Sequence, residues 1–70
     1  MLKIFTVTGM SCNNCARHVT QAVESVGGEV TSINYGSGKT VIETNGVDNR
    51  TLVDAIFEAG YDVINIEVDN

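Results

Sequence analysis

Some segments of the chain have the composition of strands, and others have apolar residues at the three- and four-residue spacing of helices. Together they predict strands and helices in a definite order. Residues 2–8 are rich in β-branched and aromatic side chains and predict a strand, with Phe5 and Val7 facing inward. The next apolar stripe has helical spacing and consists of Val19, Ala22, Val23 and Val26. We expect this helix to end at Gly27-Gly28, because glycine adopts the left-handed C-terminal conformation without steric cost.

The second half of the chain predicts two strands, a helix and a final strand. Val30, Ile33 and Tyr35 mark the second strand, and residues 35–39 have the composition of a hairpin turn before a third strand at 40–44. Asp48 is a candidate N-cap whose carboxylate would accept from free backbone N–H groups. The helix that follows carries Leu52, Ala55, Ile56 and Ala59, ends at Gly60, and precedes a last strand at 63–68.

The two halves of the chain form a weak internal repeat. The stripe of the first helix recurs 33 residues later in the second, and the same displacement places Gly27 on Gly60 and Val30 on Val63. The order is therefore βαβ followed by βαβ. Two interleaved right-handed units of this kind predict the α+β, ferredoxin-like βαββαβ fold, with a four-stranded antiparallel sheet and both helices on one face. In that fold the first strand-to-helix loop, the central hairpin and the Gly60-Tyr61 turn share one end.

Length and charge restrict the function. Seventy residues predict one domain, residues 1–70, and no apolar run approaches the roughly 20 residues that span a bilayer. The chain starts at Met1 without a signal peptide, so we expect a complete small cytoplasmic protein that does not insert into a membrane. The net charge of −5 argues against nucleic-acid binding, which requires a basic surface, and permits docking on a basic patch of another protein.

The two cysteines, Cys12 and Cys15, are the candidate functional residues. They follow the first strand and precede the first helix, where the helix dipole and free N–H groups favour thiolate over thiol. Arg17, one turn further on, would add to this effect. The pKa should therefore fall below the free value of about 8.5. A thiolate at this position suits either metal binding or disulfide exchange.

Ligand number and proline content favour the metal. A closed zinc site requires four nitrogen or sulfur ligands, and the chain has two cysteines and one histidine. Two thiolates suit an ion that accepts near-linear sulfur coordination, such as Cu(I) or Hg(II), and soft sulfur ligands select Cu(I) among common cellular metals. Thioredoxin-like oxidoreductases place a cis-proline opposite the thiol pair, and this chain contains no proline. A non-enzymatic metal-binding role is therefore favoured over thiol–disulfide exchange.

The string Gly9–Cys15, GMSCNNC, resembles the G-M-[ST]-C-x-x-C motif of the heavy-metal-associated domain family. The resemblance extends to Gly27-Gly28 and to Gly60–Asp62 (GYD), and is greatest to small bacterial copper chaperones of the CopZ and Atx1-like type. It implies that Cys12 and Cys15 bind Cu(I) and pass it to the amino-terminal domains of a copper-transporting P-type ATPase. Related domains bind mercury, zinc or cadmium. A copper-bridged homodimer would follow if two such pairs shared the metal.

Several neighbours of the cysteines have alternative interpretations. His18 is either a third ligand, a pH-sensitive group or an exposed helix residue, and Met10 is expected to anchor the loop in the core. Tyr61 should lie beside the cysteine loop, where its hydroxyl either contacts a thiolate or the ring simply packs. Asp62 is expected to be an exposed carboxylate. We expect residues 13–14, both asparagine, to cap the helix start and not to bind metal.

Overall fold

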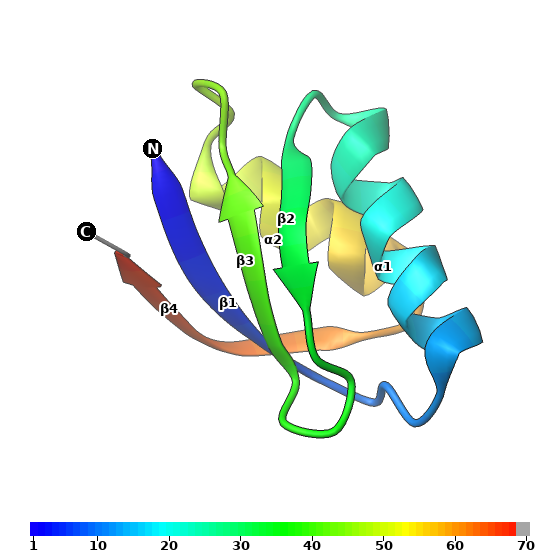
Figure 1. Ribbon diagram of the computed structural model, residues 1–70. Coiled ribbons are helices and arrows are strands. Elements are labelled where there is room, and N and C mark those ends of the chain that lie inside the picture. The colour runs from blue at the N-terminus through cyan, green and yellow to red at the C-terminus, as the bar shows by residue number, and fades with distance from the viewer. Residues whose placement is uncertain (69–70) are drawn as a thin grey trace.

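Six elements follow one another in the order βαββαβ in the computed structural model, which describes residues 1–68. The last two residues of the expected domain, 69–70, lie outside the described residues. The four strands form one antiparallel sheet in the order β2-β3-β1-β4, and both helices cover the same face of it (Figure 1). The elements are β1 Leu2–Thr8, α1 Asn13–Ser25, β2 Glu29–Ile33, β3 Lys39–Glu43, α2 Asn49–Glu58 and β4 Asp62–Val68. The expected ferredoxin-like arrangement is confirmed.

The hydrophobic core lies between the sheet and the helices, as the apolar spacing predicted. Phe5 and Val7 of β1 are 0% and 3% exposed, so the expected inward pair is confirmed. The helices contribute the fully buried side chains Val19, Val23, Leu52 and Ile56. Ala16 is also buried, which extends the α1 stripe one turn towards the cysteines. Because that turn is fixed by the core, the first residues of α1 have a defined position relative to the sheet.

Strand β2 is shorter than the sequence predicted, because a turn begins immediately after Ile33. The side chain of Asn34 accepts hydrogen bonds from the backbone N–H groups of Gly36 and Ser37, at 2.9 and 3.2 Å. These bonds stabilise the turn that follows, while the backbone of Asn34 still pairs with Lys39 and Gly38 across the hairpin, at 2.9 and 2.7 Å. Tyr35 therefore lies in the hairpin turn, as the composition of residues 35–39 predicted, with 42% of its surface exposed. The prediction that it also marks the second strand is wrong.

The helix starts differ from the predicted capping. Asp48 does occupy the N-cap position of α2, but its carboxylate makes no capping hydrogen bond within the described residues. At α1 the N-cap is Cys12, so Asn13 and Asn14 lie inside the first turn and the prediction that they cap the helix is wrong. An asparagine can cap only from the extended position before the first helical residue, and here that position belongs to a cysteine.

Strand pairing brings three loops to one end of the sheet. β1 pairs with β4 such that Thr8 lies opposite Asp62, next to the Gly60-Tyr61 turn. On the other side of β1, the backbone N–H of Val7 donates to the carbonyl of Gly38 in the hairpin, at 2.8 Å. The cysteine loop, the hairpin and the α2–β4 turn therefore share one end, as expected. Neither helix within residues 1–68 is long and apolar enough to cross a membrane.

Candidate metal centre

The two cysteine sulfurs lie side by side at the start of α1. Cys12 is the extended N-cap residue, with φ −161° and ψ 175°, and Cys15 lies in the first turn of the helix. Their Sγ atoms are 3.7 Å apart, and both thiols are free. Cys12 is exposed and Cys15 is half-buried against the core. The structure thus places the sequence-predicted pair together at the surface, with one sulfur more accessible than the other.

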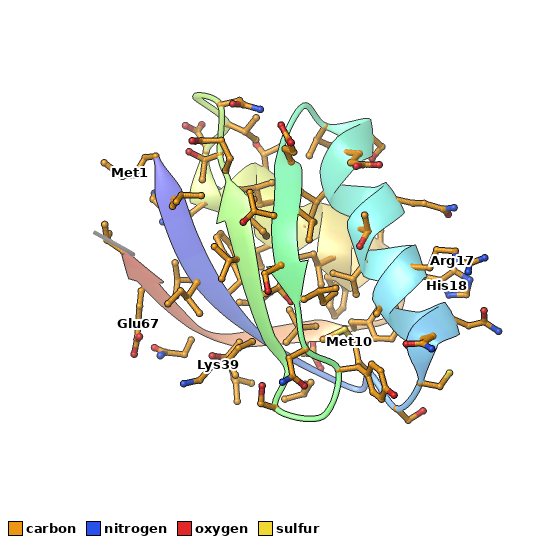
Figure 2. The ribbon with its side chains drawn as sticks, viewed as in Figure 1. Met1, Met10, Arg17, His18, Lys39 and Glu67 are labelled. Carbon is orange, nitrogen blue, oxygen red and sulfur yellow. The ribbon has the colours of Figure 1, made fainter. Side chains whose placement is uncertain are left out.

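The loop that carries the cysteines is fixed to the core by Met10. This side chain is 8% exposed and belongs to the core cluster, and it points into the layer between sheet and helices (Figure 2). Met10 is therefore a core anchor, as expected. Before it, Gly9 has φ +93°, and a Cβ built there would lie 3.3 Å from the Tyr61 ring. The loop depends on a glycine at this position both for its backbone conformation and for the close approach of Tyr61.

Hydrogen bonds to its sulfur lower the pKa of Cys15 from 9.0 to about 6. The largest contribution comes from the backbone N–H of Ser11, followed by the Tyr61 hydroxyl and the Cys12 side chain; partial burial opposes them. The Ser11 hydroxyl also lies 3.9 Å from the Cys15 sulfur. The prediction of a lowered thiol pKa is confirmed for Cys15. Its cause differs from the expected one, because the leading donor precedes the helix and Arg17 is not among the contributing groups.

Tyr61 connects the cysteine loop to α1, which confirms its expected position. The pKa of Tyr61 is raised, chiefly through its interaction with the side chain of Cys15. Its hydroxyl oxygen lies 3.4 Å from Nδ1 of His18. His18 itself is exposed on α1. Tyr61 therefore interacts with two residues of α1, His18 and Cys15.

The other candidate neighbours do not join the thiols. Arg17 projects from α1 into solvent beside His18 (Figure 2). Asp62 is an exposed residue of β4, as expected, and contacts Thr8 through its backbone. No group of three or more His, Cys, Asp or Glu side chains within residues 1–68 is arranged to hold a metal ion. The donor set on this part of the surface is therefore the sulfur pair.

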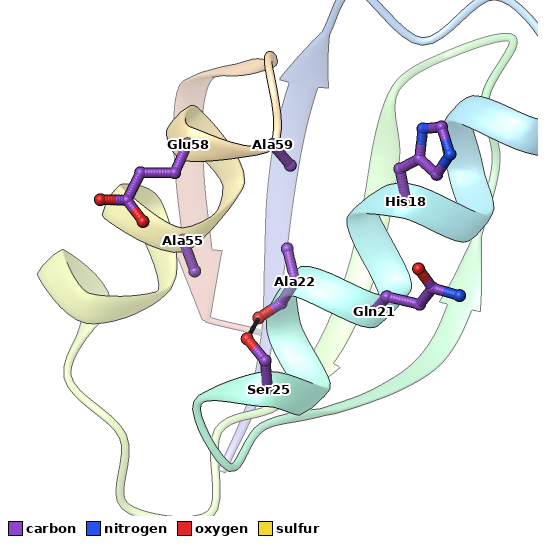
Figure 3. Close-up of a pocket in the computed structure, with 7 residues that line it drawn as sticks. All are labelled: His18, Gln21, Ala22, Ser25, Ala55, Glu58 and Ala59. Atoms are coloured by element: carbon purple, nitrogen blue, oxygen red, sulfur yellow. Dashed lines mark hydrogen bonds between the residues drawn. The ribbon is translucent and has the colours of Figure 1, made fainter.

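A groove of about 420 Å³ runs between α1 and α2, beside the thiols and not at them. It is lined by His18, Gln21, Ala22, Ser25, Ala55, Glu58 and Ala59, and Figure 3 shows the alanines of the two helices facing each other. Small side chains at these positions let the helices approach without filling the space between them. The helical spacing of Ala22, Ala55 and Ala59 predicts core positions and does not indicate this groove.

Fold and site together define a small α+β metal-binding domain with an exposed pair of thiols before its first helix. The heavy-metal-associated domain family matches residues 4–62, and the chain belongs to this family. Membership confirms the resemblance of the GMSCNNC string and agrees with the observed βαββαβ order.

Curated relatives contain this domain as a small part of a longer protein. The chain is 32% identical over 62 residues to a mercuric reductase of Lysinibacillus sphaericus, covering 87% of the chain and 11% of the relative. It is 34% identical over 56 residues to a copper-exporting P-type ATPase of Mycobacterium tuberculosis, covering 79% of the chain and 7% of the relative. The chain thus spans about a tenth or less of the length of these relatives.

Solved structures of similar length share the whole fold. The chain matches the CopZ metallochaperone with a TM-score of 0.78 and 34% identity, over 91% of the chain and all of that protein. It matches the copper chaperone Atx1 from Synechocystis PCC6803 with a TM-score of 0.77 and 33% identity, over 87% and 97%. The N-terminal domain of ZntA in its Zn(II) form gives a TM-score of 0.79 and 28% identity, over 90% and 88%.

Proposed function

We propose that this chain is a cytoplasmic copper chaperone that binds Cu(I) through Cys12 and Cys15. The observation that carries the proposal is the pair of free sulfurs 3.7 Å apart at the surface, with no further ligand cluster within residues 1–68. Two soft thiolates without obligatory oxygen or nitrogen ligands are the donors that select Cu(I). The similarity to the CopZ metallochaperone supports a chaperone role, and the similarity to the copper chaperone Atx1 supports copper as the metal.

The site is suited to giving the ion away by ligand exchange. A cysteine of the partner, after losing its proton to solvent, enters as thiolate and forms a third sulfur–copper bond. One of the bonds to this domain then breaks, and the released sulfur takes up a proton or remains thiolate. A second cysteine thiolate of the partner replaces the remaining sulfur in the same way, which frees the ion from this domain. Copper stays Cu(I) throughout, so no oxidant or reductant is required. Exposure of Cys12 supports this route, because an incoming sulfur reaches the ion without displacing the core.

The proposed acceptor is an amino-terminal metal-binding domain of a copper-transporting P-type ATPase. A copper-exporting ATPase contains a segment 34% identical to this chain, which supports a partner that carries a domain similar to this one. Transfer between two such sites needs no enzyme activity in the chaperone. The match to a mercuric reductase covers 11% of that protein, so it supports a shared metal-binding segment and not a reductase activity for this chain.

Zinc is the second candidate metal, favoured by one geometric observation. Two zinc–sulfur bonds of about 2.3 Å at the tetrahedral angle place the sulfurs about 3.8 Å apart, close to the observed 3.7 Å. A linear pair with bonds of that length requires about 4.6 Å. The exposed Cys12 side chain can rotate to supply the difference. The match to the zinc form of the ZntA domain supports testing zinc directly.

Competition between Cu(I) and Zn(II) under reducing conditions tests the assignment. The expected result is one Cu(I) per chain, retained in an excess of Zn(II), with uptake abolished in the Cys12→Ser, Cys15→Ser double variant while its circular dichroism is unchanged. Tight binding of one copper ion by the double variant would contradict the site. Displacement of Cu(I) by Zn(II) would favour the second candidate, and catalytic turnover of a disulfide substrate would contradict the non-enzymatic role.

A further inference from the structure

A tight turn between β3 and α2 places an asparagine directly before a glycine. The backbone N–H of Val47 donates to the carbonyl of Thr44 at 2.8 Å, and the two residues between them, Asn45 and Gly46, have φ of +51° and +81°. Positive φ at both central positions is typical of a type I′ turn. Because β3 runs away from the cysteine loop, this turn lies at the end of the sheet remote from the sulfurs (Figure 1).

The side chain of Asn45 ties this turn to the end of α1. Its Nδ2 donates to the carbonyl oxygen of Gly27 at 3.2 Å, and Gly27 lies two residues past the last residue of the helix. The backbone N–H of Asn45 donates to Oε2 of Glu43 at 3.4 Å. The Asn45 amide therefore joins two segments that are 18 residues apart in the chain.

The peptide nitrogen of Gly46 is accessible next to this amide. Among residues 1–68 no acceptor pairs with its N–H, and a Cβ built on Gly46 would have nothing within 4 Å. Glycine also lacks the side chain that crowds the peptide nitrogen after other asparagines. The remaining asparagines of the described chain, at 13, 14, 34, 49 and 65, all precede residues that carry side chains. Asn45 is therefore the asparagine whose Cγ is least hindered from meeting the next peptide nitrogen.

We propose that Asn45 is a spontaneous modification site that the fold protects through its bond to Gly27. The peptide nitrogen of Gly46 loses its proton to water and attacks Cγ of Asn45, and the side-chain nitrogen takes up a proton from water and departs as ammonia. The cyclic succinimide that remains adds water at either carbonyl and opens to aspartate or isoaspartate. Because the attack requires Cγ to move onto the Gly46 nitrogen, the hydrogen bond to Gly27 restrains it.

The products break the tie between the turn and α1. A carboxylate has no hydrogen to donate, so at position 45 it would face the carbonyl oxygen of Gly27 as a second acceptor. Isoaspartate in addition lengthens the backbone of the turn by one carbon. Modified protein should therefore unfold more easily, while the two thiols, at the other end of the sheet, stay unchanged.

The first test follows the modification by peptide mass spectrometry in reduced, metal-free protein at pH 8. The product should appear at Asn45, and about two- to tenfold more slowly in the folded protein than in guanidinium chloride, the factor that one hydrogen bond supplies. A synthetic peptide of residues 42–48 in both solvents corrects for the effect of the denaturant. Faster modification of another asparagine in the folded protein, or a folded rate that equals or exceeds the unfolded one, would overturn the proposal.

A variant of the glycine tests the attacking atom. Gly46→Ala keeps Asn45 and adds a methyl group beside the peptide nitrogen, so the reaction in guanidinium chloride should become slower. The unfolded chain is used because the backbone strain of this variant is then absent. A rate equal to that of the parent would show that the Gly46 nitrogen is not the nucleophile.

The second test measures the tie itself by urea unfolding of Asn45→Asp. The folding equilibrium constant should fall about two- to tenfold, since the donor to Gly27 is lost. Gln21→Glu is the matched control, because it makes the same change of amide to carboxylate at an exposed position of α1. Its constant should stay close to that of the parent, since Arg17 at i−4 offsets Glu24 at i+3. Equal losses in the two variants would show that Asn45 does not tie the turn to α1.

The inference does not depend on the metal. All three measurements use metal-free protein, so their failure leaves the copper proposal standing, and failure of copper binding leaves them unaffected.

Discussion

The backbone N–H of Val7 donates to the carbonyl of Gly38 at 2.8 Å, and this contact joins the end of β1 to the β2–β3 hairpin. The approach is so close that a Cβ on Gly38 would lie 2.2 Å from the carbonyl oxygen of Val7. Gly38 also has φ +80°, in the left-handed region. The hairpin can therefore reach the cysteine end of the sheet only with glycine at this position.

Replacing Gly38 with alanine should destabilise the fold by about 2–4 kcal/mol, because backbone strain and a clash with backbone atoms act together. Gly46→Ala is the matched control. Gly46 has φ +81° but nothing within 4 Å of a built Cβ, so it should lose only the left-handed penalty of about 1–2 kcal/mol. Urea unfolding of both variants measures the difference. Equal losses in the two would show that the Val7 contact does not constrain the hairpin.

The Cys15 thiol should titrate with a midpoint near pH 6 in the metal-free protein, because hydrogen bonds from Ser11 and Tyr61 stabilise its thiolate. Carbon-13 NMR of the Cys15 Cβ between pH 4 and pH 10 measures this midpoint directly. Tyr61→Phe should move it upwards, since the variant removes the second-largest stabilising contact. A midpoint near 9.0 in the parent protein would contradict the arrangement of donors around the sulfur.

The same thiol should make folding stability depend on pH. Between about pH 6 and pH 9 the folded protein holds Cys15 as thiolate while the unfolded chain still binds the proton, so stability rises with pH through this window. The contribution is fully present above pH 9 and is lost as the pH falls through 6. Urea midpoints should show this rise in the metal-free protein. The Cys15→Ser variant should show a smaller rise, and an equal rise would assign the effect to other groups.

Thr40 offers a stabilising substitution in the core. Its side chain is fully buried, and its hydroxyl oxygen has no hydrogen-bond partner within residues 1–68. Thr40→Val removes the unsatisfied group at nearly constant shape and should stabilise the protein by about 1 kcal/mol. Thr44, the residue after the end of β3, is the control. It is also buried, but its hydroxyl donates to the carbonyl of Met1 at 3.2 Å. Thr44→Val should be destabilising in the same urea assay.

Copper should promote a dimer of this domain. Two exposed sulfur pairs that face each other can place four thiolates around one or more Cu(I) ions, and the exposed Cys12 is the sulfur within reach of a second copy. Sedimentation velocity with and without one equivalent of Cu(I) measures the change. Cys12→Ser should reduce the dimer fraction. Copper-loaded protein that sediments only as a monomer would contradict this expectation.

The fold could be predicted from the sequence because its signals are periodic and local. The repeat that relates Gly27 to Gly60 has a clear structural meaning: both glycines follow a helix and have φ of +101° and +102°. Two pairs of equivalent stripe positions are buried in both helices, Val19 with Leu52 and Val23 with Ile56. The stripe does not extend to Ala59, which is exposed after the end of α2. Phe57 shows that the spacing is more informative than hydrophobicity alone, because it is apolar but lies outside the stripe and is 65% exposed.

Topology alone brought Tyr61 to the cysteine loop, so that contact could also be predicted. The role of Ser11 could not, because its N–H meets the Cys15 sulfur only through the path of the loop after Gly9. The contact between His18 and Tyr61 depends on two side-chain rotamers, which the spacing of residues does not determine. The same holds for Asn34, whose side chain ended β2 before Tyr35.

The directions of β1 and β4 determine where a linker to another domain would be attached. β1 runs towards the cysteine loop and β4 runs away from it, so Lys3 and Val68 are paired at the opposite end of the sheet (Figure 1). Any polypeptide attached beyond these strands would leave from the end remote from the sulfurs. A linker attached there would let the domain reorient while the two sulfurs stay accessible to a partner.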